Sequence, residues 1–395
     1  MTIMAHLMAA ALAICVYIYF GYPLLIWLVG KVRPRPVSKG PIRPFVTVIV
    51  PVYNEEEVIG DKIRNSLSLD YEAENMEILI VSDGSRDNTE TVVRQGEDAR
   101  VRFLSLERMG KAHALNEGVK QARGEIVVFT DANAMLERHS LIRLVENFAD
   151  PAVGGVCGNQ RYRTAGRADL RRADATEKGE NMYWEYDKWL KSMESLTGNI
   201  FAADGSLHAI RRKLYVPIKD PAQADDIAIS TRIVLQGYRL VYEPEAVSYE
   251  NPPSEGPKEF KRKVRVTNRS LRALLNLKGS LWTSGFYSLQ LLSHKFFRHL
   301  LFFPLLVLFV LNVAIAGHHP LFLILLGGQV LFYGLAIIGY KLKNSRFSRL
   351  KLISIPYYFC LANAAAFLGV LSLLQGDHVA MWEPRSGAEK MPAPD

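Results

Sequence analysis

The stretch VTVIVPVYNE, residues 46–55, decides the fold of this chain. Its first five residues are all β-branched, and Pro51 ends the run just before a polar loop. The same pattern returns in EILIVSDGS, residues 77–85, and in EIVVFTDAN, residues 125–133. Segments typical of helices lie between and beside these runs, at residues 56–68, 89–95 and 111–122. Buried strands that alternate with helices predict an α/β fold, with a mostly parallel sheet covered on both faces.

Each predicted strand runs into a loop that carries polar side chains. Tyr53 and Glu55 follow the first strand, Asp83 follows the second, and Asp131 and Asn133 follow the third. Ligands of such sheets bind outside the carboxyl ends of the strands, so these loops are the candidate binding site.

The loop after the second strand also allows a purely structural interpretation. Gly84 lets the backbone approach a ligand, and Asp83 could accept hydrogen bonds from a base or a ribose. Alternatively, this is an ordinary strand-to-helix turn in which Asp87 or Asn88 caps the next helix.

The loop after the third strand is a candidate metal site. Asp131 and Asn133 project to the same side of an extended segment. A Mg²⁺ or Mn²⁺ ion needs only one or two protein oxygens where a diphosphate and water supply the rest. Because the second ligand is an asparagine, the site carries less charge than a pair of aspartates would. A simple turn is the alternative.

An acidic pair, Asp225 and Asp226, opens a predicted helix over Ile227–Gln236 that Gly237 ends. Carboxylates at this position stabilise the positive end of a helix. One of them could also act as a general base, and the two roles are compatible.

Long apolar segments flank the predicted α/β region. Ile3–Val29 contains no charged residue and lacks the basic start of a cleaved signal peptide, so it is expected to span a membrane. Leu300–Ala316 and Leu321–Tyr340 are further candidates, and Leu352–Leu374 is either a fourth span or a broken, re-entrant element. The stretch at residues 281–300 mixes aromatic and basic residues, which is typical of an amphipathic helix at the interface.

The positive charge of the chain follows these apolar segments. The formal net charge is +8, and five basic residues come soon after the first segment. They are Lys31, Arg33, Arg35, Lys39 and Arg43. This distribution favours flanked membrane spans over nucleic-acid binding, and it predicts that the α/β region faces the cytoplasm. The three scattered cysteines fit neither a disulfide framework nor a zinc site.

Together the motifs resemble the family 2 glycosyltransferases with the GT-A fold, in particular the membrane-integrated cellulose, hyaluronan and poly-N-acetylglucosamine synthases. Besides the strand loops, the segments at residues 110–116 and 197–212 and the acidic pair fit this family in order and spacing. The resemblance covers about residues 46–272. It also extends to the tail motif Trp382-Glu383-Pro384-Arg385, which would bring the tail to the cytoplasmic side.

The resemblance implies a role for each matching residue. Asp226 would be the catalytic base, and Tyr53, Glu55 and Asp83 would contact uridine. The residues expected to bind the nucleotide sugar are Tyr53, Glu55, Asp83, Lys111, Asp131, Arg262 and Arg265. Those expected on the acceptor side are Gly198, Asn199, Asp225 and Trp184, and the expected metal ligands are Asp131 and Asn133. For Trp184, packing against the sheet is the favoured alternative.

The chain departs from the Gln-x-x-Arg-Trp motif of the processive synthases, where the aligned stretch is Arg262-Lys263-Val264-Arg265-Val266. Arg265 is present, but Val266 stands where the tryptophan would stack on an acceptor sugar. This puts the synthesis of long chains in question, although not sugar transfer itself. A basic amphipathic helix on anionic lipid is the alternative for this segment.

The resulting hypothesis is an inverting glycosyltransferase that moves sugar from a UDP-sugar to a growing glycan and forms a β-linked product, with Mg²⁺ or Mn²⁺ as cofactor. Membrane lipids are expected partners, nucleic acid is not, and protein partners stay open. The alternatives are a single transfer to a lipid or polyprenyl phosphate and a nucleotide-binding scaffold without turnover. The expected segments are a membrane helix at 1–30, a cytoplasmic GT-A domain at 31–275, an interface helix at 276–299, a membrane region at 300–375 and a tail at 376–395.

Overall fold

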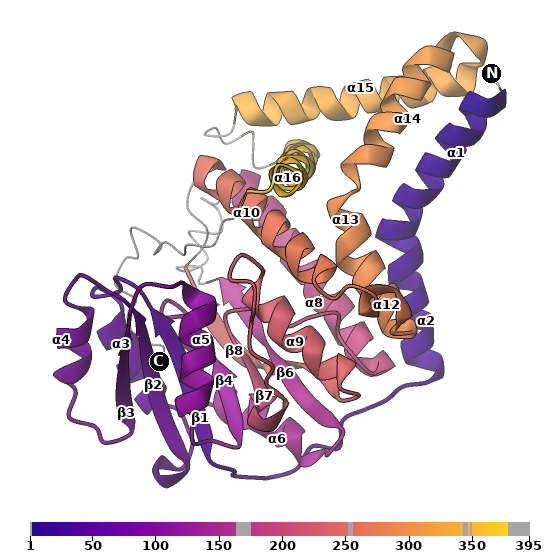
Figure 1. Cartoon of the computed structure of the whole chain (residues 1–395). Helices are drawn as coiled ribbons and strands as arrows, with labels where there is room; N and C mark the ends of the chain where they lie inside the picture. Colours follow the sequence, from indigo (N-terminus) through magenta and orange to yellow (C-terminus); the bar gives the residue numbers. More distant parts are fainter. Residues whose placement is uncertain (1, 163–174, 252–255, 343–346, 348–349, 378–395) are drawn as a thin grey trace.

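The computed structural model describes residues 2–162, 175–251, 256–342, 347 and 350–377 of the 395-residue chain. They form an α/β domain and a set of apolar helices that extends from one side of it (Figure 1). The tail motif at residues 382–385 lies outside the described residues.

The first membrane segment is a nearly continuous helical rod. It consists of α1 (Thr2–Val16), a π-helical turn (Tyr17–Gly21) and α2 (Tyr22–Val32). The rod has 31 residues and a mean hydropathy of 2.1, so it is long and apolar enough to cross a bilayer.

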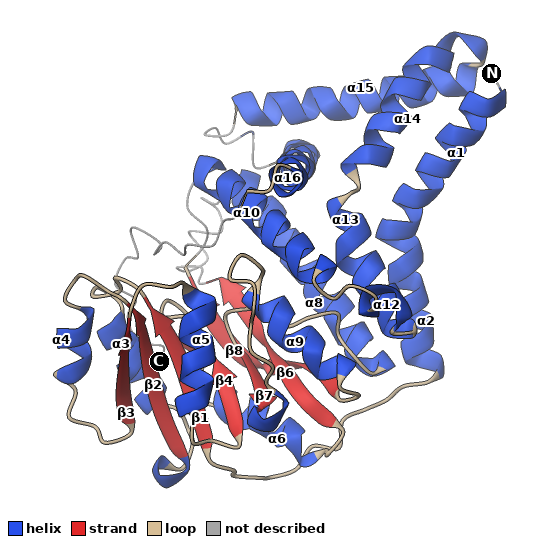
Figure 2. Cartoon of the chain, viewed as in Figure 1, coloured by secondary structure: helices blue, strands red, loops and turns tan. Residues whose placement is uncertain are grey.

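The α/β domain is built on one eight-stranded mixed sheet in the order β3-β2-β1-β4-β7-β6-β8-β5 (Figure 2). The strands are β1 (Val46–Val52), β2 (Met76–Asp83), β3 (Val101–Leu106), β4 (Ile126–Phe129), β5 (Met135–Leu136), β6 (Val153–Tyr162), β7 (His208–Arg211) and β8 (Arg239–Glu250). Strands β3, β2, β1 and β4 run parallel to one another, whereas β7 is antiparallel to both of its neighbours. The predicted α/β fold is therefore confirmed, and β1, β2 and β4 correspond to the three predicted strands.

Helices cover both faces of the parallel half of the sheet. The helices of the domain are α3 (Ile59–Leu67), α4 (Thr89–Arg94), α5 (Lys111–Gln121), α6 (Ser140–Glu146), α8 (Ala175–Thr197) and α9 (Asp225–Leu235). All residues of β1 and β2 are buried, as their continuous apolar sequence predicts. Helix α5 packs closely because it has Gly118 at the contact, where a Cβ atom would come within 3.1 Å of both Ile49 and Val81.

The helices after the sheet depart from the predicted pattern in two places. They are α10 (Gly256–Leu275), α11 (Ser280–Thr283), α12 (Phe286–Gln290), α13 (Phe297–His299), α14 (Phe302–Ile315), α15 (Pro320–Lys341) and α16 (Lys351–Leu374). The single interface helix expected at 276–299 is instead three short helices with a π-helical turn at Leu291–Phe296. Helix α16 runs unbroken through Pro356, so of the two alternatives for this segment the structure favours a continuous helix over a broken element.

Two of these later helices, α15 and α16, pass the length and hydropathy test for a membrane span on their own. The segment Phe286–His299 passes only together with α14, to which it is bent by 55°. Figure 1 shows α14 beside α1, and α16 close to the basic helix α10. The last helix therefore covers the side of the α/β domain at which the site lies.

Candidate functional site

The loops after β1 and β2 are tied together by hydrogen bonds between side chains and backbone. Asn54 adopts a left-handed conformation with φ 52°, and its side-chain oxygen accepts from the Arg86 N–H at 2.8 Å. The Glu55 N–H donates to the Thr89 hydroxyl at 2.9 Å. The two predicted loops therefore form one structural unit, which holds Glu55 at the edge of the cavity.

Asp83 is fully buried and holds the chain segment that precedes α5. Its carboxylate accepts from the N–H groups of Met109 and Gly110, at 2.8 and 2.9 Å, and lies 3.1 Å from the Arg108 guanidinium. The same guanidinium lies over the Tyr53 ring, 3.0 Å from its centroid. Asp83 thus builds the loop in front of Lys111, whereas direct contact of Asp83 or Tyr53 with a nucleotide stays a prediction.

Lys111 connects the acidic pair with the loop after β4, which carries the predicted metal ligands Asp131 and Asn133 and is called the metal loop below. Its Nζ lies 2.8 Å from Asp131 Oδ1 and 3.1 Å from Asp225 Oδ2. Burial disfavours the charged amine, but the two carboxylates outweigh burial and raise the pKa of Lys111 above its usual value. One permanent positive charge therefore lies between residues that the sequence places about a hundred positions apart.

The two carboxylates of the acidic pair have different environments at the start of α9. Burial opposes ionisation of Asp225, but Lys111 and Arg269 overcome it and lower its pKa to about 2. Burial, together with the charge of Asp225, raises the pKa of Asp226 to about 6. Asp225 is therefore a fixed anion, and Asp226 is the carboxylate that can exchange a proton near neutral pH.

Asp226 and Asp131 face the same space. An added Cβ atom on Gly205 would lie 3.8 Å from Asp226 Oδ2 and 3.9 Å from Asp131 Oδ2. The absence of a side chain at Gly205 thus keeps open the space between the proton-accepting carboxylate and the predicted metal ligand.

The donor atoms of the metal loop are suited to a hard divalent cation. Asp131 and Asn133 both line the cavity and offer oxygen ligands. Among the described residues there is no group of three or more His, Cys, Asp or Glu side chains that could hold a metal alone. The residues present thus fit an ion that shares its coordination with a diphosphate and water, and the assignment of Asp131 and Asn133 as its ligands stays a prediction.

A buried lysine supports the metal loop from behind, which the sequence did not reveal. Lys62 has no exposed surface, and its Nζ donates to the Thr130 hydroxyl at 2.9 Å and to the Ala134 carbonyl. The lysine thus fixes both ends of the segment that carries Asp131. The sequence does offer one hint of this role. Lys62 lies on the inner face of the amphipathic helix α3, where burying a lysine without a partner would cost free energy.

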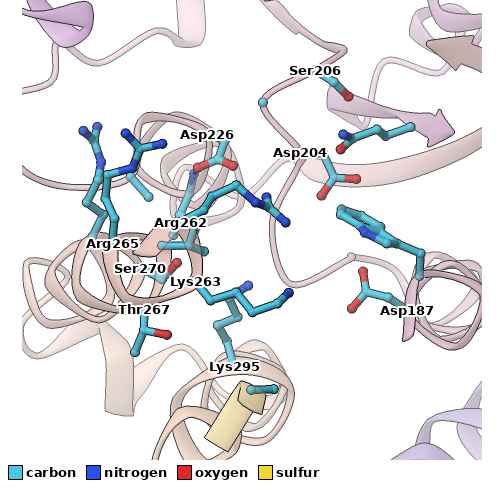
Figure 3. A pocket seen from close by; sticks show the side chains of 18 of the residues that line it. Asp187, Asp204, Ser206, Asp226, Arg262, Lys263, Arg265, Thr267, Ser270 and Lys295 are labelled. Carbon is cyan, nitrogen blue, oxygen red and sulfur yellow. Dashed lines mark hydrogen bonds between the residues drawn. The ribbon is translucent and has the colours of Figure 1, made fainter. Parts of the chain in front are cut away.

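A cavity of about 540 Å³ joins these groups to the later helices (Figure 3). Its lining includes the predicted residues Glu55, Lys111, Asp131, Asn133, Trp184, Asp225, Asp226, Arg262 and Arg265. Val266, 38% exposed, also lines the cavity, so the residue in the tryptophan position faces the site. Trp184 packs edge-on against Tyr162 at a centroid distance of 6.0 Å, so it has both a packing contact and a cavity face.

Two predicted acceptor-side residues lie elsewhere. The Asn199 side chain accepts from the Leu240 N–H at 3.0 Å, and the Gly198 carbonyl accepts from Arg239 at 3.1 Å. Neither is among the described residues that line the cavity. Their positions indicate that they join α8 to the sheet, so the predicted acceptor role is not supported.

Asp204 lines the same cavity and was not among the predicted residues. Lys191 holds its carboxylate with Nζ at 2.6 and 2.7 Å from the two oxygens, and both residues line the cavity. The sequence does contain a hint of Asp204, because Asp204-Gly205-Ser206 repeats the triplet Asp83-Gly84-Ser85 of the loop after β2.

Comparisons with known proteins agree with this geometry. The family described as "Glycosyl transferase family 2" matches residues 47–216. The chain is 32% identical over 236 residues to the poly-beta-1,6-N-acetyl-D-glucosamine synthase of Staphylococcus aureus (strain COL). The aligned region covers 58% of this chain and 55% of that protein. The chain is 29% identical over 278 residues to the synthase of the same name from Staphylococcus epidermidis, covering 64% and 65%. The chain thus matches about half the length of the first of these curated relatives.

Among solved structures, the fold matches mannosyltransferase PcManGT from Pyrobaculum calidifontis, in complex with GDP-Man and Mn²⁺. The TM-score is 0.70 at 26% identity, and the match covers 94% of this chain and 99% of that one. The match therefore extends beyond the α/β domain into the apolar helices. Residues 47–216 thus match a family 2 glycosyl transferase domain, the fold is of the GT-A type, and the chain is similar to poly-beta-1,6-N-acetyl-D-glucosamine synthases.

Proposed function

We propose that this protein is an inverting, metal-dependent glycosyltransferase in which Asp226 is the general base. The observation that carries the proposal is the shared space between Asp226 and Asp131, next to Gly205. A base and a metal loop that face one space suit a reaction in which an acceptor is deprotonated while a diphosphate departs. The raised pKa of Asp226 supports this role, because a base is most effective when its pKa lies near the working pH.

The reaction follows from the positions of these groups. An acceptor hydroxyl attacks the anomeric carbon from the face opposite the diphosphate, and its proton passes to Asp226. The bond between the anomeric carbon and the diphosphate oxygen breaks, and its electron pair leaves with the diphosphate. Arg262 and Arg265 can hold the departing diphosphate through their planar guanidinium groups. A divalent cation at Asp131 and Asn133 would neutralise further charge on the diphosphate when bound.

The proposed donor is a UDP-sugar, and the proposed product is a β-linked glycan. The family resemblance and the homologous polysaccharide synthases support this choice. GDP-mannose is a second candidate because the structural neighbour that covers 94% of this chain contains it.

The test is an assay of the purified full-length protein against UDP-N-acetylglucosamine, UDP-glucose and GDP-mannose, each with and without Mn²⁺. Release of the nucleoside diphosphate identifies the donor, and the proton NMR coupling of the new anomeric centre reports its configuration. A β-linkage from an α-linked donor is expected. Retention of configuration, or no release from any donor, would refute the proposal, and the second result would leave a nucleotide-binding scaffold.

We further propose that the α/β domain lies on the cytoplasmic side of the membrane, as one domain over residues 31–275. The basic residues after the first helix and the cytoplasmic location of nucleotide sugars support this orientation. Single cysteines at Thr2 and Ser38, in a background without native cysteines, can be probed on intact cells with an impermeant maleimide. Labelling at Thr2 but not at Ser38 is expected, and the reverse would overturn the orientation.

A further inference from the structure

The cavity has two walls of opposite charge. Its acidic wall comes from the sheet loops, α8 and the start of α9, and it also carries Lys111 and Lys191. The carboxylates of this wall are Glu55, Asp131, Asp187, Asp204, Asp225, Asp226 and Glu250. The opposite wall comes from α10, the π-helical turn and α13. The described charged residues of that wall are all cations: Arg262, Lys263, Arg265, Arg269, Lys295 and Arg298. An anionic group that enters is therefore attracted to the helical wall.

The cations of the helical wall differ in their partners. Arg262 lies 2.7 Å from Glu259, and Arg298 lies 3.7 Å from Asp187. Lys295 forms no ion pair with any carboxylate in the described part of the chain, and its Nζ lies 5.4 Å from the centroid of the Phe201 ring. Lys295 therefore brings a positive charge to the cavity that no described carboxylate neutralises.

A third surface of the same cavity is apolar. Ile355, Phe359, Ala362 and Ala366 recur every three or four residues, so they share one face of α16, and all of them line the cavity. This helix is apolar enough to lie in a membrane, with a mean hydropathy of 1.7. Aliphatic side chains and alanines match hydrocarbon better than they match the hydroxyl groups of a glycan.

Base, cations and apolar face follow one another along the cavity. In Figure 3, Asp226, Arg262, Lys263 and Lys295 succeed each other from the top of the view to the bottom. Lys263 also links the cations to the apolar helix, because its Nζ donates to the Tyr358 hydroxyl at 2.9 Å. A ligand that fits has a hydroxyl, an anion and a hydrocarbon chain in the same order.

We propose that the acceptor is a sugar carried on a lipid through a phosphate or diphosphate group. The sugar hydroxyl lies at Asp226, the phosphate on the cationic band (Lys263, Lys295 and Arg298), and the hydrocarbon chain against α16. This inference rests on the proposed glycosyl transfer and names its acceptor. The acceptor O–H bond breaks, its proton goes to Asp226, and the new glycosidic bond replaces the bond to the donor diphosphate, while the lipid phosphate is unchanged.

The nucleophile is the sugar hydroxyl and not the lipid phosphate. A phosphate oxygen is already ionised near neutral pH and needs no base, whereas a hydroxyl does. The position of Asp226 beside the open space at Gly205 therefore suits a hydroxyl acceptor.

The first test is equilibrium binding of three probes to the full-length protein in detergent: phytanyl phosphate, phytanol and inorganic phosphate. Only phytanyl phosphate combines the anion with the hydrocarbon, so it alone should bind well. Lys295→Gln should weaken its binding about tenfold, the equivalent of one charge-assisted hydrogen bond. Lys261→Gln is the matched control, because Lys261 is an exposed lysine of α10 outside the cavity lining and its loss should change nothing.

Two results would overturn the proposal. One is equal binding of phytanol and phytanyl phosphate, and the other is the same affinity in Lys295→Gln and Lys261→Gln. These results can be told apart from a failure of the proposed glycosyl transfer. If that function is wrong, no nucleotide sugar will serve as a donor, whether or not phytanyl phosphate binds.

The second test is kinetic and uses the donor identified above, with N-acetylglucosamine on phytanyl diphosphate and the same sugar on a neutral phytanyl glycoside. Lys295→Gln should raise KM for the charged acceptor about tenfold and leave kcat unchanged, because Lys295 binds and does not react. For the neutral glycoside KM should not change. Transfer onto phytanyl phosphate itself that survives Asp226→Asn would contradict the proposal and identify the phosphate as the nucleophile.

Discussion

The site has two halves, the loops proposed to bind the donor (the donor half) and the helices proposed to bind the acceptor (the acceptor half), and these are held together in different ways. In the donor half, neighbouring loops satisfy one another's hydrogen-bonding groups. Asp83 accepts hydrogen bonds from the backbone of Met109 and Gly110, and the Glu55 N–H donates to Thr89. In the acceptor half, the groups come from α8, α9, α10 and the π-helical turn, which are joined by contacts between segments far apart in sequence, such as the ion pairs of His294 with Asp187 and of Arg269 with Asp225. The difference indicates that the donor half is preformed by local structure, whereas the acceptor half depends on how the apolar helices lie against the sheet domain.

The side chain of Lys111 joins the two halves. Lys111 bridges Asp131 on the donor side and Asp225 on the acceptor side. Away from this contact, a change in one half should leave binding in the other half intact. Substitutions confined to one half test that independence.

The largest effect is expected from Asp131→Ala, on the donor side. Loss of the carboxylate should abolish metal-dependent nucleotide binding, because Asn133 cannot replace a charged ligand. Calorimetric titration of the nucleotide with and without Mn²⁺ measures it, and phytanyl phosphate binding is the control that should persist. Unchanged metal dependence in the variant would mean that the ion is held by other residues.

The second-largest effect is expected from pH, which should change kcat/KM through Asp226 but leave nucleotide binding in the donor half unaffected. Asp226 must be ionised to accept a proton, and burial together with Asp225 raises its pKa to about 6. The value of kcat/KM should therefore be low below this pH, rise with pH through it and level off above it. Asp225 adds no step there, because Lys111 and Arg269 lower its pKa. Nucleotide affinity over the same range should not follow this profile, and a constant kcat/KM from about pH 5 to about pH 8 would contradict the role of Asp226.

A moderate effect is expected from Gly205→Ala. The added methyl group would have ordinary contact distances of 3.8 and 3.9 Å to the carboxylates of Asp226 and Asp131, so the fold should accept it. It would, however, occupy the space in which the acceptor hydroxyl must lie. We expect kcat/KM to fall about tenfold, while the melting temperature and nucleotide affinity stay the same. Loss of nucleotide binding in this variant would show that the halves are not independent there.

The smallest effect is expected from Val266→Trp, which restores the aromatic residue of the processive synthases. Val266 is exposed to the cavity, so a tryptophan there could stack on an acceptor sugar. Products should become longer or the acceptor KM lower, as measured by mass spectrometry and steady-state rates. If the parent already makes long, polydisperse chains, Val266 is sufficient for processivity. A short, fixed product from both proteins would assign length control to the membrane helices.

The same contrast between the halves explains what the sequence could predict. The donor half follows from β1, β2 and β4 because a buried parallel strand and the loop after it are encoded in consecutive residues. Lys62 was missed because its partners, Thr130 and Ala134, lie on a loop far away in sequence.

The acceptor half was harder to predict because its residues are brought together by tertiary contacts. Asp204 shares its triplet with Asp83, yet only the fold sets it beside Lys191 in the cavity. Lys295 could be recognised only as part of an interface helix, and the π-helical turn that carries it has no clear sequence signature. Gly198 and Asn199 were assigned to the acceptor by resemblance, whereas their hydrogen bonds go to the sheet.

The central claim, that Asp226 is the base of a glycosyl transfer, is tested most directly by the turnover of Asp226→Asn. The amide keeps the shape of the side chain but cannot accept the proton, so turnover should fall by about 10²–10⁴-fold. Nucleotide binding should be unchanged. The variant should also be at least as stable as the parent near neutral pH, because the raised pKa of Asp226 means that the fold disfavours its ionised form. Near-normal turnover in a folded, nucleotide-binding Asp226→Asn protein would contradict the account.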